Sequence, residues 1–177
     1  MTVTVPEPTA TLKDAAREAG HERRKSGGKG LRGESARPSL SGRGHAYFEH
    51  TADVGIRAWG PTMGDAFAEA ALGLVANMVD VSQAKVVGEA RIEVEAESLE
   101  RLLFHFLDDV LDLFYTKLWV IREVDVRLEG DKRLVATLKG ETYDEARHGH
   151  VHEIKAMTFH EMRITREPPE VRVIVDI

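Results

Sequence analysis

Hydrophobic and polar residues alternate in short runs after residue 44, and this period of two predicts β-strands. Residues 46–50 and 54–60 form two such runs, "AYFEH" and "VGIRAWG", separated by Thr-Ala-Asp. A third run, "EARIEVEAE", covers residues 89–97 and alternates cleanly between charged and apolar positions. In each run the apolar positions define one face, which we expect to point into a core.

Two longer segments follow the helical period instead. Pro61-Thr62 opens the first, where Thr62 is placed to cap the helix and Asp65 stands three residues on, as in a capping box. Ser98 is placed to cap the second, "LERLLFHFLDDVLDLFYTK". Apolar residues recur every three or four positions in both and form one apolar stripe per helix. We interpret these stripes as core.

The last third of the chain predicts four more strands. "VDVRLEGDKRLVATLKG" is typical of a hairpin with Gly130-Asp131 in its turn. "KAMTFHEMRIT" and "VRVIVDI" follow, joined across Pro168-Pro169, and the second is apolar on both faces, as in a central strand. The order of elements predicts an α+β two-layer domain, with a mixed, largely antiparallel sheet and two helices packed on one face.

Charge divides the chain into two parts. Residues 1–45 hold nine Lys and Arg against five acids, whereas the remainder holds 15 against 25. The arm is rich in Gly, Ser and Arg and has few large apolar side chains, so it cannot offset its ordering entropy by burial. We expect residues 1–44 to be a disordered basic extension and residues 45–177 to be the folded domain. The alternatives for the extension are a segment that touches RNA or a partner, and a start site assigned too early.

Composition excludes several classes of protein. The 177 residues include no cysteine, which rules out disulfides, thiolate metal sites and cysteine nucleophiles. No apolar run approaches the roughly 20 residues of a membrane span, and the polar N-terminus lacks the apolar region of a secretory signal. Phosphate-loop, dinucleotide-binding and zinc-protease motifs are missing as well. We therefore expect a cytoplasmic protein with no membrane partner.

Acidic groups gather at two places that a sheet could bring together. Asp53 stands in the turn between the first two strands, and Asp176 ends the last strand beside the terminal carboxylate of Ile177. A carboxylate ending a central strand is costly to desolvate unless it is paired or binds a cation. An oxygen-rich pocket of this kind suits Ca²⁺, Mg²⁺ or Mn²⁺. The alternative is that Asp53 only forms the turn and Asp176 pairs with an arginine.

The histidines allow fewer conclusions. His148, His150 and His152 would share one face of an extended segment, but "YDEARHGHVHEIK" is polar and more typical of a solvated loop. His105 falls among core positions of the second helix and is expected to be buried. His50 and His160 lie on or beside strands near the Asp53 turn. Lys155 opens a strand, where a lysine usually faces solvent unless it reaches an anion.

Three blocks of sequence together resemble the archease family. They are "YFEHTADVGIRAWG" with the Ala-rich helix that follows, "GETYDEARHGHVHEIKAMTFHEMRI", and the ending "VIVDI", which lie in the family's order over residues 46–177. The first 45 residues lie outside the resemblance. It implies a cation site at Asp53, Asp176 and Ile177, and an activating role for Lys155. We expect His50, beside the Asp53 turn, to act with Lys155 in contacting the partner.

The resemblance also implies a function. Archeases are non-catalytic cofactor proteins of the GTP-dependent tRNA-splicing ligase, promoting its guanylylation and multiple turnover, so RNA would be contacted indirectly through the ligase. Two other hypotheses stay open from the residues alone. One is a stand-alone metal-dependent phosphoester hydrolase, with His50 or His160 as its only candidate bases. The other is an RNA-binding or chaperone module.

Overall fold

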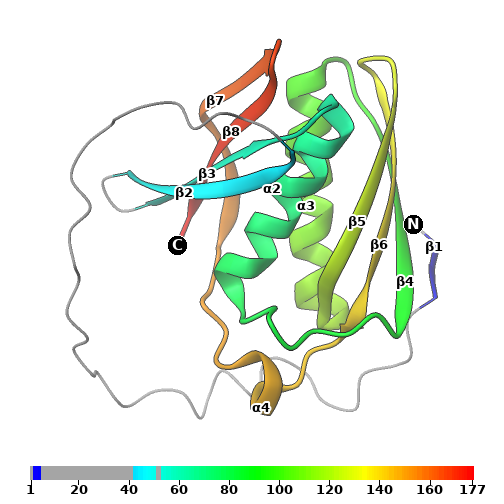
Figure 1. Ribbon diagram of the computed structural model, residues 1–177, viewed down its shortest axis with the longest axis vertical. Helices are drawn as coiled ribbons and strands as arrows, with labels where there is room; N and C mark the ends of the chain where they lie inside the picture. Colours follow the sequence, from blue (N-terminus) through cyan, green and yellow to red (C-terminus); the bar gives the residue numbers. More distant parts are fainter. Residues whose placement is uncertain (1, 5–41, 51–52) are drawn as a thin grey trace.

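Two antiparallel sheets lie on either side of two long helices in the computed structural model of this protein, which describes residues 2–4, 42–50 and 53–177 (Figure 1). Sheet A has the strand order β1 (Thr2–Thr4), β4 (Gly88–Glu95), β6 (Arg133–Thr142), β5 (Trp119–Glu129). Sheet B has the order β2 (Gly44–His50), β3 (Asp53–Trp59), β8 (Pro169–Asp176), β7 (Ala156–Arg166). All the strand pairs are antiparallel.

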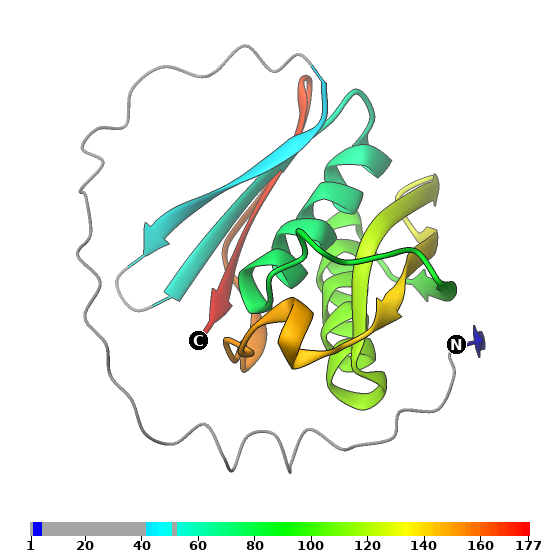
Figure 2. The same ribbon diagram turned by 60° about the horizontal axis from the view of Figure 1, so that its bottom comes forward.

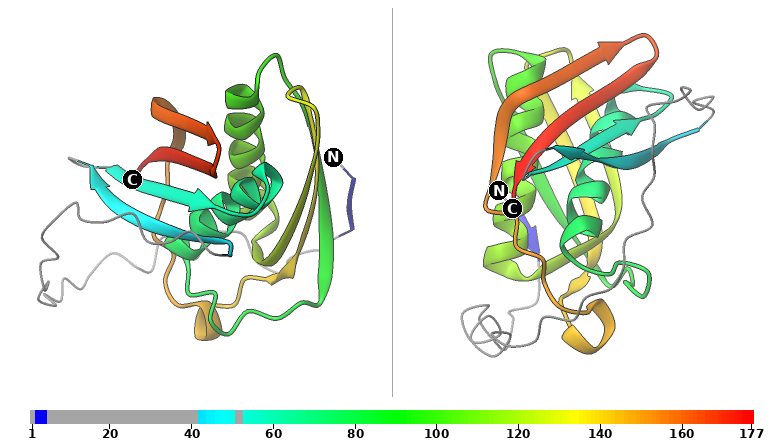
Figure 3. Two further views of the ribbon diagram at one scale, coloured as in Figure 1. Left: turned by 45° about the horizontal axis from the view of Figure 1, so that its top comes forward. Right: turned by 90° about the vertical axis from the view of Figure 1, so that its left-hand side faces the viewer.

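The two long helices, α2 (Met63–Met78) and α3 (Leu99–Lys117), lie between the sheets (Figures 1 and 3). Helix α2 contacts β5 of sheet A and β2, β3 and β8 of sheet B, whereas α3 contacts β7 of sheet B and all three long strands of sheet A. The α+β class is therefore confirmed. However, the strands divide between two sheets, and the helices have a sheet on each side instead of covering one face of a single sheet.

The burial of α2 explains this difference from the expected two-layer arrangement. Eleven of its 16 residues are buried and surround the helix axis: Gly64, Ala66, Phe67, Ala68, Glu69, Ala70, Ala71, Gly73, Leu74, Val75 and Met78. A helix that is buried nearly all round must have protein on both sides. Its small residues permit close approach, and a Cβ added to Gly64 would collide with the carbonyl oxygen of Val126 on β5.

Local signals in the sequence are confirmed where they concern caps and turns. Thr62 and Asp65 form the capping box of α2, and the Ser98 side chain accepts a hydrogen bond from the Arg101 amide at the start of α3. Strands β5 and β6 form the expected hairpin, joined through residues 130–132. Strand β8 is central in sheet B, as its two apolar faces indicated.

The N-terminal part of the chain is described only in pieces. The expectation of a disordered extension over residues 1–44 falls largely on residues 5–41, which lie outside the described ones, and it stays a prediction. Thr2–Thr4 form β1, which pairs with β4, and this strand was not expected. Strand β2 begins at Gly44. Within the described residues, no helix is long and apolar enough to cross a membrane.

Candidate functional site

The register of sheet B brings Asp53 and Asp176 to the same end of adjacent strands. Val54 on β3 pairs with Val175 on β8, and each aspartate is the next residue outward on its strand. On the other side of β8, Ala156 of β7 pairs with Asp176, so Lys155 precedes β7 at this same end. The structure thus gathers three of the residues that the sequence singled out. The pairing of β3 with β8 brings Asp53 to Asp176 from more than 100 residues away, and the pairing of β7 with β8 adds Lys155.

Both aspartates point away from the helices. Val173 and Val175 of β8 belong to the hydrophobic core, so the alternating positions, including Asp176, face the opposite side of sheet B. We call this the outer face of sheet B. Asp53 shares that face because residues directly opposite in an antiparallel pair project to the same side. Its side chain is partly buried, and that of Asp176 is half exposed.

Lys155 is bound to the end of β8 by two separate contacts. Its backbone N–H donates to the Asp176 carbonyl oxygen at 2.8 Å, and its Nζ donates to the main-chain oxygen of Ile177 at 2.6 Å. The same Nζ lies 3.9 Å from Asp176 Oδ1. More than half of the Lys155 side chain is exposed, so the ammonium group balances the local negative charge while remaining open to solvent.

The donor set at this end consists of carboxylate oxygens, which is the chemistry that hard divalent cations prefer. Asp53, Asp176 and the terminal carboxylate of Ile177 are the groups that could hold such an ion. The described part of the chain contains no cluster of three or more His, Cys, Asp or Glu suited to a metal. The two aspartates alone do not make such a cluster, and the expected role of Ile177 as a third ligand stays a prediction. His50 pairs with Asp53 in the sheet register, and its side chain is outside the described set.

None of the other histidines that the structure describes belongs to a cluster suited to a metal ion. His148 ends the short helix α4 (Glu145–His148) and is fully buried, while His150 and His152 are exposed, so the three do not share a face. The expectation of a solvated loop is therefore wrong for His148. His105 is exposed on α3, contrary to the expected burial, because the buried stripe of α3 passes through Phe106 and Leu102 instead. His160 is exposed on β7.

A buried polar cluster centred on Glu141 was not predicted from the sequence. Glu141 accepts hydrogen bonds from Arg147 Nη1 at 2.7 Å to both of its oxygens and from the Lys85 backbone N–H at 2.8 Å. Because the Asp144 N–H donates to His148 Nδ1, the proton on His148 Nε2 is directed at Glu141 Oε1, 3.2 Å away. Burial alone would raise the pKa of Glu141, but Arg147 and the other donors hold it below its ordinary value.

Strand β7 contains a wide bulge close to the candidate site. Thr158 pairs with Ile174 and Arg163 with Arg172, so four residues of β7 stand against Val173 alone. Within the bulge Glu161 adopts a φ of 50°, which is uncommon for a residue other than glycine. Phe159 is half exposed and stacks on Phe104 of α3, with ring centroids 4.0 Å apart. Bulges often re-aim side chains next to functional sites, and no pattern in the sequence indicated this one.

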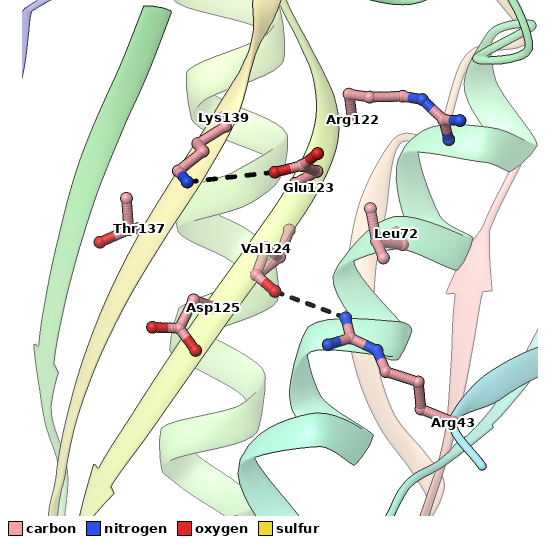
Figure 4. A pocket seen from close by; sticks show the side chains of 8 residues that line it. All are labelled: Arg43, Leu72, Arg122, Glu123, Val124, Asp125, Thr137 and Lys139. Atoms are coloured by element: carbon pink, nitrogen blue, oxygen red, sulfur yellow. Dashed lines mark hydrogen bonds and ion pairs between the residues drawn. The ribbon is translucent and has the colours of Figure 1, made fainter. Parts of the chain in front are cut away.

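A surface pocket of about 340 Å³ lies elsewhere, between the start of β2, helix α2 and strand β5 (Figure 4). Its walls mix charges of both signs, with Lys139 4.0 Å from Glu123 and an Arg43 nitrogen 3.4 Å from the Val124 carbonyl oxygen. None of the residues singled out from the sequence lines it. The candidate site is thus an open sheet end and not this pocket.

Comparisons with known proteins agree on one family. The archease protein family matches residues 45–177. The chain is 42% identical over 125 residues to a protein named archease from Thermococcus gammatolerans, covering 69% of this chain and 88% of that one. It is 38% identical over 139 residues to a protein archease from the fish Ictalurus punctatus, covering 75% and 85%. The solution structure of Methanobacterium thermoautotrophicum protein 1598 superposes with a TM-score of 0.62 at 30% identity, covering 76% of this chain and 99% of that one.

Proposed function

Because this chain belongs to the archease family, we propose that it is a non-catalytic activator of the GTP-dependent tRNA-splicing RNA ligase. It acts in the cytoplasm, promotes guanylylation of the ligase and restores multiple turnover, and it contacts RNA through the ligase. Family membership supports a role in tRNA splicing as a cofactor-like protein at the family level. The finer steps are our inference.

The observation that carries the proposal is the convergence of charges at one open end of sheet B. Asp53 and Asp176 end adjacent strands on the same face, and Lys155 is bound beside them by the contacts to Asp176 and Ile177. An anionic group and an ammonium side by side at a solvent-exposed strand end can enter a partner's active site. An enclosed substrate cavity would instead indicate chemistry within this chain.

Each residue has a defined part in this proposal. Asp53, Asp176 and the Ile177 carboxylate hold a divalent cation, of which Ca²⁺, Mn²⁺ and Mg²⁺ are the candidates. When bound, such an ion neutralises phosphate charge and orients the leaving group of nucleotidyl transfer. Lys155 keeps the end of β8 in place and offers a point charge to the same phosphates. The acidic body of the chain favours association with a basic RNA-handling partner.

A ligation assay with RNA in excess over the ligase tests the proposal. We expect this protein to raise the amount of guanylylated ligase and the number of turnovers, and Asp53→Asn to lose most of that effect while melting at nearly the same temperature. Asp125→Asn is the matched control, because Asp125 is an exposed aspartate of β5 on sheet A. An unchanged ligase rate with the unmodified protein, in Mn²⁺ and in Mg²⁺, would refute the proposal.

A further inference from the structure

The outer face of sheet B carries a row of three arginines on adjacent strands. Arg172 on the central strand β8 lies directly opposite Arg57 on β3 and Arg163 on β7. Val171 and Val173, on either side of Arg172, belong to the core, so all three arginines project away from the helices. The strands that carry them belong to sheet B, which lies on the other side of the long helices from sheet A in Figure 2. Like charges directly opposite one another destabilise a sheet unless anions balance them.

Two of the arginines are held in place by an acid and an aromatic ring. Arg57 Nη2 is 2.6 Å from Glu170 Oε2, and its guanidinium carbon is 5.8 Å from the centre of the Trp59 ring. Arg172 lies 3.9 Å over the Phe48 ring and 3.6 Å from Glu161 Oε2. Such cation–π contacts orient the planar guanidinium groups before any ligand arrives. This lowers the entropy cost of binding.

The position of the Phe48 ring depends on a glycine. Phe48 pairs with Gly55 in the register of β2 and β3, and a Cβ added to Gly55 would collide with that ring. Glycine weakens the interior of a strand, and it often marks a place where another group must approach closely. Here it allows Phe48 to lie over β3, within reach of Arg172.

The arginine row retains positive charge that the protein itself does not match. The Arg163 side chain is exposed and forms no hydrogen bond or ion pair with the described part of the chain. The Nε of Arg172 is buried and has no hydrogen-bond partner, which is a costly condition for a charged donor. Two acids, Glu161 and Glu170, face three guanidinium groups. An oxyanion ligand at the exposed guanidinium nitrogens would relieve the charge imbalance.

We propose that this row, Arg57, Arg172 and Arg163, binds phosphate groups of a single-stranded RNA lying across the outer face of sheet B. The inference rests on the proposed function, in which the partner of this protein handles RNA, and it adds a direct contact with that RNA to the one that the ligase provides. Guanidinium forks match phosphate oxygens in bidentate geometry. Arg172 is four residues, roughly 13 Å, along β8 from Asp176. An RNA held at the row therefore reaches the candidate cation site at the end of the same strand.

Binding of a fluorescent 12-nucleotide single-stranded RNA to the protein alone, without ligase or added metal, tests this site by anisotropy over a range of salt concentrations. Arg163→Glu should weaken binding about tenfold and reduce the salt slope by about one, as for the loss of a phosphate contact. Arg163→Gln should weaken it by about threefold. Arg163 makes no contacts that the fold requires, so circular dichroism of both variants should match the parent protein.

The matched control is Arg127→Glu, which changes the net charge equally but lies on β5 of sheet A, where Arg127 pairs with Glu129. It should change RNA affinity less than twofold. The inference is overturned if the parent protein does not bind RNA at low salt, or if Arg127→Glu weakens binding as much as Arg163→Glu does. It is also overturned if Arg163→Glu spares RNA affinity but weakens binding to the ligase, since the row would then contact an acidic protein surface. Failure of the proposed function appears separately, as unchanged ligase turnover.

Discussion

Lys155, the residue before β7, donates a 2.6 Å hydrogen bond from its Nζ to the main-chain oxygen of Ile177, the last residue of the sequence. The Lys155 backbone N–H binds the Asp176 carbonyl oxygen in the same place. These contacts fix the direction in which the chain leaves β8. They also place the carboxylate of Ile177 beside Asp176, so that changes to the chain end and changes to Lys155 act on one cluster of charges.

A short tag added after Ile177 should therefore abolish most of the activation of the ligase. The new peptide bond removes the terminal carboxylate, and the added atoms lie across the open end of sheet B. Losing one of three anionic ligands should lower the affinity for a divalent cation at least tenfold, since each charge matters more in a partly desolvated site. Calorimetric titration with Mn²⁺ and Ca²⁺ and the ligation assay measure the two effects.

Amidation of Ile177 separates charge from bulk in this experiment. It removes the negative charge and adds almost no volume, so we expect it to reproduce the loss of cation affinity. An equally short tag at the N-terminus serves as the control and should change neither quantity. A C-terminally tagged protein that binds the cation and activates as well as the parent would disprove the role of Ile177.

Lys155→Ala should separate cation binding from activation. The ammonium group lies 3.9 Å from Asp176 Oδ1 and bonds the Ile177 oxygen, so it competes with a cation for the same carboxylates. Removing it should raise the divalent affinity several-fold, given about 1 kcal/mol for two unit charges 4 Å apart in water. Activation should nevertheless fall, because the partner loses a positive charge.

Lys139→Ala is the control for Lys155→Ala, since Lys139 is an exposed lysine near Glu123 on sheet A. It should leave cation affinity and activation unchanged. If Lys155→Ala activates the ligase as well as the parent does, the lysine only holds the C-terminal end of β8 in place. Lower cation affinity would show that it orders the ligands instead of competing with the ion.

Pattern and local chemistry carried much of the fold prediction, because caps, turns and alternation depend on neighbours in sequence. Thr62, Ser98 and the central position of β8 follow from such neighbours. The division into two sheets could not be predicted in this way, because it depends on which strands pair across long stretches of chain. The composition of α2 was the available signal in the sequence. Its alanines and other apolar residues leave few polar side chains for a face turned to solvent, in agreement with the near-complete burial of the helix.

The candidate site was only partly accessible from sequence for a similar reason. Asp53 and Asp176 were conspicuous at strand ends, but their side-by-side position follows from the pairing of Val54 with Val175. Neither the bulge that contains Glu161 nor the cluster around Glu141 produces a periodic pattern of apolar and polar residues in the sequence. Each arises from tertiary packing that alters local geometry after the strands have paired.

Glu141→Gln should destabilise the protein by about 1–3 kcal/mol at neutral pH, the cost of weakening hydrogen bonds to a buried charged group. Opposing effects set the pKa of Glu141. Burial raises this pKa, but the hydrogen bonds from Arg147 and the Lys85 N–H lower it by more, so it lies below the ordinary 4.5. The stabilisation from the ionised group is thus fully present above about pH 4.5. It is lost as the pH falls through the folded-state pKa.

Urea unfolding of the parent and the variant at several pH values measures this difference. The two stabilities should diverge most between pH 6 and 7 and converge below pH 4.5. Glu145→Gln is the control, because Glu145 is an exposed acid on α4 whose partner is the exposed His150. A gap between the parent and Glu141→Gln that stays constant down to pH 3 would contradict an ionised Glu141 in the folded protein.

Two N-terminal truncations that differ in length by only two residues should have different melting temperatures. Removing residues 1–41 keeps Arg43, whose Nε bonds Glu69 Oε1 at 2.6 Å and whose Nη1 lies 3.5 Å from Asp65. Removing residues 1–43 also removes Arg43. Of the two side chains that bond the buried Glu69, only His45, 3.0 Å away, then remains. Burial favours a raised pKa for Glu69, and His45 and Arg43 together hold it low, so losing Arg43 should cost about 1 kcal/mol.

We expect the shorter deletion to melt within a degree or two of the full chain and to activate the ligase normally, because it removes only β1 from the described sheets and leaves β4 paired with β6. The longer deletion should melt roughly 2–4 °C lower. Arg43→Ala in the full chain is the matched variant and should reproduce that drop. If the two truncations melt together, Glu69 is satisfied by His45 alone. If the shorter one unfolds, the first 41 residues belong to the folded domain, and the boundary near Gly44 is wrong.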